Sequence, residues 1–200
     1  MSDDGMVTFE TSEEITGGQG GFVDAEGTFH FNGVSFHVNE KPDGKSYKGW
    51  TLLAKVVGGT DETQVGKQMT IYMGDKKPGG SETFWKDLRT RVLVACGFMK
   101  IEEMGKPVSF NPKEPGVFQF VAKVKANQDG DRTFYGMNYM DIYHVDDPEV
   151  ADVPKDSESL SFIDQSRRYT DPKVFERLNK KSDKKAESKS EVPTPADLDI

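Results

Sequence analysis

Several stretches of this chain alternate between apolar and polar side chains, and this alternation is the strongest constraint on its fold. A period of two places successive side chains on opposite faces of a β-strand, so each stretch predicts a half-buried strand. The stretches are residues 27–38, 49–57, 65–73, 117–125 and 132–145. Asn32-Gly33 divides the first stretch, and this dipeptide favours a type I′ turn because both positions need positive φ. Residues 27–38 are therefore predicted to form a hairpin.

In residues 81–97 the apolar side chains recur every three or four residues instead of every two. This is the spacing of a stripe along one side of a buried helix. The stripe consists of Phe84, Leu88, Val92 and Ala95. Ser81 is a suitable N-cap and Gly97 a suitable C-terminal stop. One helix is therefore predicted between the early strands and the last two.

A run of strands, one helix and two further strands is the element order of the OB-fold. That fold is a small five-stranded barrel that binds nucleic acid on one face. We therefore predict a mainly β fold with one central helix, an OB-fold-like β-barrel that occupies residues 22–145. A disordered acidic segment at the N-terminus, residues 1–21, and a disordered C-terminal tail are expected to flank it.

Both ends of the chain have the composition of disordered segments. Residues 1–21 combine five acidic residues with a glycine-rich run and contain no lysine or arginine. Residues 146–200 are predicted to be a mostly disordered tail that ends in an acidic tip at 196–200. Within this tail a short helix is predicted over residues 172–179, because an aspartate precedes it and a proline occupies its first turn.

The net charge of −8 comes from these two ends. Residues 22–145 contain 16 basic and 15 acidic residues, whereas residues 146–200 contain 10 basic and 14 acidic residues. A central domain that is nearly neutral can have a basic face. The overall acidity therefore does not exclude nucleic acid as a partner.

Cysteine use and apolar runs indicate the compartment. Cys96 is the only cysteine, so no disulfide can form within the chain, and a reducing environment is expected. No stretch resembles a signal peptide, and none has the roughly 20 apolar residues that a membrane span needs. A soluble intracellular protein without membrane contact is predicted.

Residue types used in catalysis are present but not grouped. His30 and His37 have no cysteine or carboxylate at metal-ligand spacing, and Cys96 lies in an apolar run without a nearby histidine. The glycine pairs at 58–59 and 79–80 do not continue into the Gly-Lys-Ser/Thr of a phosphate-binding loop. We predict that the protein is not an enzyme and needs no metal or cofactor.

Basic and aromatic residues alternate on the predicted strands. This mixture holds single-stranded nucleic acid, because cations contact phosphates and flat rings stack on bases. The candidate contact residues are Lys48, Trp50, Lys55, Arg89, Arg91, Lys123, Lys125, Arg132, Tyr135 and Tyr139. Aromatic residues in strands also pack in cores and in cross-strand pairs. Trp50 shares its predicted face with Leu52 and Ala54, which favours a core position for Trp50.

Three runs carry a resemblance to a known family: residues 49–59 (GWTLLAKVVGG), 65–72 (VGKQMTIY) and 84–97 (FWKDLRTRVLVACG). They resemble the phage and prophage single-stranded DNA-binding proteins found among replication and recombination genes. In that family a strand ending in a glycine pair leads to a Gly-Lys/Arg strand and then to a helix ending in Ala-x-Gly. The resemblance covers residues 27–145. It implies an OB-like fold, sequence-tolerant binding of single-stranded DNA, homo-oligomers in some members, and the cytoplasm of a bacterial host.

The C-terminal end has the layout of a partner-binding segment in single-stranded DNA-binding proteins, with a basic linker before an acidic, apolar-ended tip. The tip residues are Asp197, Leu198, Asp199 and Ile200. We expect them to recruit replication or recombination proteins and to compete with DNA for a basic face at low salt. The tip lacks the terminal phenylalanine of the usual bacterial pattern, and an ordinary frayed C-terminus is the alternative explanation.

Two further functions fit the sequence. One is a protein-binding adaptor or inhibitor that mimics DNA on a host nucleic-acid enzyme, and the other is a structural assembly component with a β-rich core. Mimicry requires acidic residues on the folded surface. The acidic excess lies instead in the two predicted tails, which favours single-stranded DNA binding.

Overall fold

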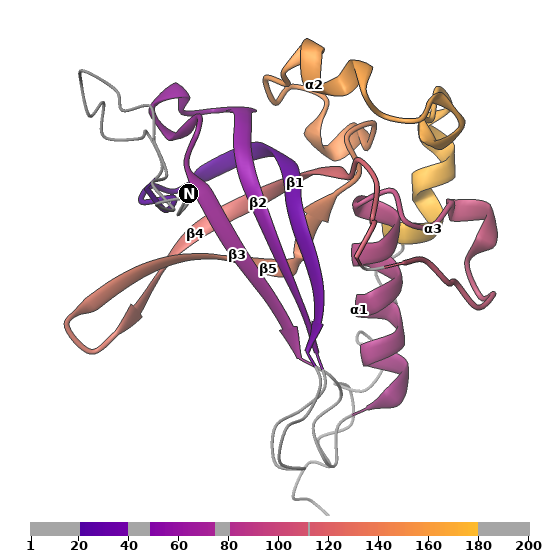
Figure 1. Ribbon diagram of the computed structural model, residues 1–200, viewed down its shortest axis with the longest axis horizontal. Coiled ribbons are helices and arrows are strands. Elements are labelled where there is room, and N and C mark those ends of the chain that lie inside the picture. The colour runs from indigo at the N-terminus through magenta and orange to yellow at the C-terminus, as the bar shows by residue number, and fades with distance from the viewer. Residues whose placement is uncertain (1–20, 40–48, 75–80, 112, 180–200) are drawn as a thin grey trace, which may run out of the picture.

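The computed structural model describes residues 21–39, 49–74, 81–111 and 113–179 (Figure 1). Within these residues, antiparallel strands form one five-stranded sheet in the order β3-β2-β1-β4-β5. The strands are β1 Gly27–Asn39, β2 Gly49–Gly59, β3 Gln68–Gly74, β4 Gln119–Asp129 and β5 Arg132–Tyr143. The predictions for residues 1–20, Lys48 and the tip at 196–200 fall outside the described residues.

The predicted central helix is confirmed. The α-helices are α1 Glu82–Ala95, α2 Ser157–Ser161 and α3 Glu176–Asn179, and the 3-10 helices are η1 Glu62–Gln64, η2 Ile101–Glu103, η3 Pro148–Val150, η4 Gln165–Arg167 and η5 Pro172–Phe175. The Ser81 hydroxyl caps α1 by accepting a hydrogen bond from the Phe84 N–H at 3.3 Å. Gly97 follows α1 with a φ of +72°. None of the described helices is both long and apolar enough to cross a membrane.

The mainly β class is also confirmed, but the sheet is not closed. β3 and β5 lie at its two edges, and no pairing joins them within the described residues. β1 lies in the middle, between β2 and β4. The predicted OB-fold-like barrel is therefore not confirmed, and two strand edges remain.

One face of the sheet forms the main core together with α1. Phe29 and Phe31 of β1 have no exposed surface, and the Phe31 ring stacks on Phe120 with the ring centres 5.1 Å apart. Leu88 and Val92 of α1 belong to the same cluster. Alternate residues of the other strands complete it: Leu52, Ala54, Val56, Met69, Ile71, Met73, Ala122, Val124 and Ile142. The period of two thus identified the buried side of most strands.

β1 is one continuous strand, so the prediction of a hairpin at Asn32-Gly33 is wrong. Its pairing with β2 continues on both sides of Gly33, with a register shift between Gly33 and Ser35. The Gly33 N–H donates to the Phe118 carbonyl at 2.8 Å. A Cβ at Gly33 would lie 2.2 Å from two atoms of the Phe118 ring. The glycine therefore permits the close approach of a ring at a bulge and does not form a turn.

β4 and β5 form a hairpin that projects from the rest of the sheet (Figure 1). Asp129 pairs with Arg132 across a tight turn in which Gly130 has a φ of +59°, within the turn predicted at 127–131. β1 pairs with β4 only as far as Val124. Beyond that residue, β4 and β5 pair only with each other in the described part of the chain. We call residues 125–136 the arm.

Residues 144–179, here called the C-terminal segment, pack against the sheet and α1. This differs from the mostly disordered tail predicted from residue 146. Val150 and Phe175 are 3% and 1% exposed. The segment first covers Val121 of β4 and then reaches α1, where Phe175 packs against Val94 (Figure 1). The helix predicted over 172–179 is present as η5 followed by α3.

Aspartate side chains begin the short helices of the C-terminal segment. Each accepts a hydrogen bond from a backbone N–H two or three residues later, which satisfies a donor at the helix start. These N-caps are Asp147, Asp156, Asp164 and Asp171. Composition counts acidic residues but not their positions, which is why this segment resembled a disordered tail.

The close contact at Gly33 predicts a large effect of one methyl group. Gly33→Ala should lower the free energy of unfolding by about 1–3 kcal/mol, because the new Cβ overlaps the Phe118 ring. Urea denaturation followed by circular dichroism measures this change. Gly21→Ala is the matched control, since nothing lies within 4 Å of a Cβ built there. Equal stability of the two variants would contradict the assignment.

Candidate nucleic-acid interface

The sheet face opposite to the core remains accessible over parts of β1, β2 and β3. Alternate side chains of the three strands lie there in register. They are Ser35 and His37 of β1, Thr51, Leu53 and Lys55 of β2, and Gln68, Thr70 and Tyr72 of β3. Each is exposed or half-buried. We call these eight residues the open face.

Tyr72 is the aromatic residue of the open face. It is 51% exposed and pairs with Thr51 of β2. Its neighbours Ile71 and Met73 point into the core and are 4% and 2% exposed. The alternation of β3 therefore holds the Tyr72 ring on the solvent side of a strand whose other face is buried.

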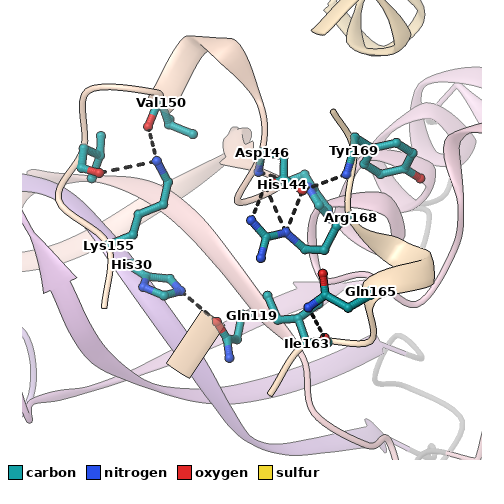
Figure 2. Close-up of polar contacts among 11 residues, drawn as sticks. His30, Gln119, His144, Asp146, Val150, Lys155, Ile163, Gln165, Arg168 and Tyr169 are labelled. Atoms are coloured by element: carbon teal, nitrogen blue, oxygen red, sulfur yellow. Dashed lines mark hydrogen bonds and ion pairs between the residues drawn. The ribbon is translucent and has the colours of Figure 1, made fainter. Parts of the chain in front are cut away.

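The C-terminal segment limits the open face. Residues 154–159 lie over the middle of the same sheet face, where a Cβ at Gly58 would be 2.9 Å from the Pro154 carbonyl oxygen. Gln119 of β4 holds this segment by donating from Nε2 to the Ser159 carbonyl at 2.5 Å. His30 of β1 lies beneath it without exposed surface (Figure 2). The covered region separates the open face from Lys123 at the base of the arm.

His30 is a structural residue in this arrangement. Its Nδ1 accepts a hydrogen bond from the Asp156 N–H at 3.2 Å, so the ring proton is on Nε2 and is donated to Gln119 Oε1 at 2.9 Å. Burial lowers the pKa of His30, in agreement with a neutral ring. Because both ring nitrogens are engaged, His30 is not placed to act as a base or a metal ligand.

A second polar cluster joins the start of the C-terminal segment to residues 168–169 farther along it (Figure 2). Arg168 donates to both carboxylate oxygens of Asp146 at 2.7–3.0 Å, and the Tyr169 N–H donates to the same group at 2.8 Å. Burial by itself raises the pKa of Asp146, but these donors outweigh it and leave the pKa below its usual value. The Tyr169 hydroxyl accepts from the Ile101 N–H at 2.8 Å, which ties the cluster to η2.

The titratable groups of the described residues do not form a recognisable catalytic or metal site. Cys96 is 1% exposed, and burial raises the pKa of its thiol far above the usual range. No three His, Cys, Asp or Glu side chains converge as metal ligands in that part of the chain. His30 and the Arg168–Asp146 pair hold segments of the fold together through hydrogen bonds and an ion pair.

Two of the predicted aromatic contacts lie on the core side of the sheet. Trp50 packs against Phe36, with ring centres 5.7 Å apart. Tyr135 also packs against the core and pairs with Ala126, so it faces away from Lys123 and Lys125. The structure therefore does not bring these two rings together with the predicted lysines.

The predicted arginines of α1 are also remote from the open face. Arg89 and Arg91 are half-buried on a helix that packs on the core side of the sheet. Arg91 donates to the Leu178 carbonyl at 2.5 Å and so holds α3 against α1. This contact gives Arg91 a structural role.

The structure does bring together Lys123, Lys125 and Arg132, which share one face of the β4–β5 hairpin by register. Phe134 pairs with Asn127 on the same face and is 52% exposed. Lys125 forms an ion pair with Asp141 at 2.9 Å, which offsets part of the positive charge. Tyr139 belongs to β5, but its side chain lies outside the described part of the structure.

Sequence reasoning missed Tyr72 and Phe134 as exposed rings. The signal for Tyr72 was present, because it alternates with Met69, Ile71 and Met73 on a predicted strand. The exposure of Phe134 depends on how far the β4–β5 hairpin extends beyond β1, and no local sequence pattern predicts this length. Among the predicted residues whose side chains the structure describes, Lys55 alone lies on the open face.

The chain was compared with known protein families and with curated proteins, and neither comparison finds a match. The resemblance to phage single-stranded DNA-binding proteins is therefore still a prediction from the sequence. The open face and the arm are the features of the structure that bear on its function.

Acidification should destabilise the fold through His144, which is 3% exposed beside Asp146 and Arg168. Burial lowers the pKa of His144 from 6.5 to about 4, so the unfolded chain binds a proton first as the pH falls. This stability is complete above pH 6.5 and is lost as the pH falls towards 4. The free energy of unfolding should drop by about 2 kcal/mol between pH 7.5 and pH 5.

Urea denaturation at a series of pH values measures this loss. His144→Phe removes the titration of His144 and should make the curve less steep, although its stability at pH 7.5 will also change. The slope that remains includes the contribution of His30, whose pKa burial also lowers. His37→Gln is the control, because it replaces an exposed histidine and leaves the burial of His144 unchanged. A wild-type protein that is equally stable at pH 5 and pH 7.5 would rule out this role.

Proposed function

We propose that this protein binds single-stranded DNA without catalysing a reaction, in the cytoplasm of a bacterial host, and that the open face is its main contact surface. The observation that carries the proposal is the half-exposed Tyr72 ring, held by β3 on the same sheet face as Lys55. A ring on a strand provides a stacking surface for a base, and stacking tolerates any sequence. Lys55 lies on the same face, four residues along β2 from the Thr51 that pairs with Tyr72, and can contact a phosphate farther along the strand of DNA.

The connection of the strands supports an OB-type fold. β1 pairs with both β2 and β4, α1 lies between β3 and β4 in the chain, and β3 and β5 are the edges. An OB-fold is a partly open Greek-key barrel that binds oligonucleotides on its strand 2–3 face and at the loops between strands 1 and 2 and between strands 4 and 5. The open face corresponds to the strand 2–3 face, and the arm carries the loop between strands 4 and 5.

The distribution of lysines supports the same surface. The register places Asn39, Gly49 and Gly74 side by side at the end of the sheet where Tyr72 lies. The sequence adjoining these ends, at residues 40–48 and 75–80, contains five lysines and three acidic residues. Lys48 is one of them and stays a predicted phosphate contact. Lys123, Lys125 and Arg132 would add contacts along the arm.

A second function, mimicry of DNA, has one observation in its favour. Residues 146–179 belong to the folded body and contain nine acidic and five basic residues. Four of these carboxylates cap helices and a fifth pairs with Arg168. Local structure therefore accounts for most of this acidity, and DNA binding is the better supported function.

Removing the Tyr72 ring should weaken DNA binding. Tyr72→Ala should raise the Kd for a labelled oligo-dT by about 5- to 150-fold, because stacking contributes roughly 1–3 kcal/mol per base. Fluorescence anisotropy at low salt measures the Kd. Phe162→Ala is the matched control, because Phe162 is 62% exposed on the C-terminal segment, away from the open face.

The two variants separate the possible outcomes. A loss for Tyr72→Ala with wild-type binding for Phe162→Ala supports the open face. Equal affinities for both would remove the open face as the contact surface. No binding by the wild-type protein, even at low salt, would end the DNA proposal and favour a protein partner.

The tip at Asp197–Ile200 is proposed to recruit replication or recombination proteins and to compete with DNA for the binding surface. A chain that ends at Asn179 should therefore bind oligo-dT more tightly than the full chain at low salt, and the difference should shrink at high salt. Parallel anisotropy titrations of the two chains test this. Identical affinities at low salt would show that the tip does not compete.

A further inference from the structure

The backbone of β3 has a free edge whose direction can be read from its hydrogen bonds. The Gln68 N–H donates to the Gly21 carbonyl at 2.9 Å, and the Gln68 carbonyl accepts from the Val23 N–H at 3.0 Å. Both groups of Gln68 therefore point away from β2, whereas the Lys67 carbonyl points towards β2 and accepts from Val56 at 2.9 Å. Because successive residues of a strand alternate in direction, the backbone groups of Thr70 and Tyr72 also point away from β2.

These groups have no hydrogen-bond partner among the described residues. Residues 21–23 cover the edge at Gln68 but not at Thr70 or Tyr72. Figure 1 shows β3 at the margin of the sheet, beyond β2. An exposed strand edge is a template for pairing with another strand.

The two edges of the sheet differ in how they are protected. β5 carries Arg132 and Asp141, and its pairing with β4 is irregular between Ala122 and Val124. Charges and irregular pairing are devices that keep strand edges apart. β3, with the sequence QMTIYMG, has no charged residue and no proline. Its edge therefore lacks the features that discourage association.

We propose that β3 pairs with β3 of a second copy of this chain, antiparallel, around a two-fold axis at Ile71. In this register Thr70 faces Tyr72 of the partner subunit, and the converse pair follows by symmetry. The two pairs would form four backbone hydrogen bonds with the groups that now lack partners. Neither strand brings a charge, so no like charges face each other across the two paired strands.

The free edge limits the length of this pairing. Residues 21–23 already occupy Gln68, so Gly74 of the partner subunit, which would face Gln68 in this register, cannot pair there. Thr70 and Tyr72 remain as the outward-pointing residues that a symmetric pair can use, and the partner strand has to leave the edge after Tyr72. The paired sheets would be continuous, with Tyr72 of both copies on one face. The contact is short, so association should be weak and should increase with protein concentration.

Disulfide trapping tests the register without DNA, so its result is independent of the proposed function. Residues paired through hydrogen bonds have Cα atoms about 5.5 Å apart, within disulfide range. Thr70→Cys chains mixed with Tyr72→Cys chains, one of them carrying a purification tag, should form a mixed disulfide dimer under mild oxidation. Each variant alone should form about tenfold less, because identical positions lie beyond roughly 7 Å in this register.

Thr70→Cys mixed with Phe162→Cys measures random collisions, since Phe162 is exposed on the C-terminal segment. Cys96 is 1% exposed and should not compete. Selective formation of the mixed Thr70→Cys and Tyr72→Cys dimer supports the proposal. A yield equal to the collision control, or to either variant alone, overturns it.

Sedimentation of charge variants gives a second test that does not require cysteine. Thr70→Glu with Tyr72→Glu places like charges opposite each other across the two-fold axis, and this double variant should remain a monomer at high concentration. Thr70→Lys with Tyr72→Glu places opposite charges there and should associate as the wild type does. A wild-type protein that stays monomeric at high concentration, or equal association of both double variants, would overturn the proposal.

Discussion

The pairing of β1 on both of its sides is the constraint on which the rest of the structure depends. β1 pairs with β2 along most of its length and with β4 over its first part, and its inward side chains are buried in the core that the sheet shares with α1. The strand can run through this crowded position because Gly33 leaves room for the Phe118 ring. A side chain there would force β1 and the start of β4 apart, and the core shared by both halves of the sheet would open.

The C-terminal segment decides how much of the outer sheet surface is accessible. Gln119 and His30 fix residues 156–159 over the middle of the sheet, and the Asp146–Arg168 cluster fixes the return of the chain towards α1. These contacts are buried or partly buried, and they satisfy one another's hydrogen bonds, so the covering segment is part of the fold. The open face and the arm are the surfaces that remain accessible beside the C-terminal segment.

The open sheet provides two features for binding, and closure into a barrel would remove one of them, the free strand edge. Its outer face can accept a flat ligand beside Tyr72, and its β3 edge can accept a strand. The proposed DNA contact uses side chains of β3, while the proposed self-pairing uses the outward backbone groups of the same strand. The two proposals are therefore compatible, and a dimer would place two stacking surfaces on one continuous sheet.

The sequence by itself determined which segments form strands, although not that β1 is continuous, and it determined the central helix and the buried side of most strands. These follow from local periodicity and capping, as Ser81 and the alternation of β3 show. Tertiary structure decided the role of Gly33, the covering of His30 and the separation of Lys55 from Lys123. Each of these depends on which distant segment approaches the residue, as when Phe118 reaches Gly33 or Asp156 reaches His30. A pattern of neighbouring residues carries no information about such approaches, because they are set by the packing of the whole chain.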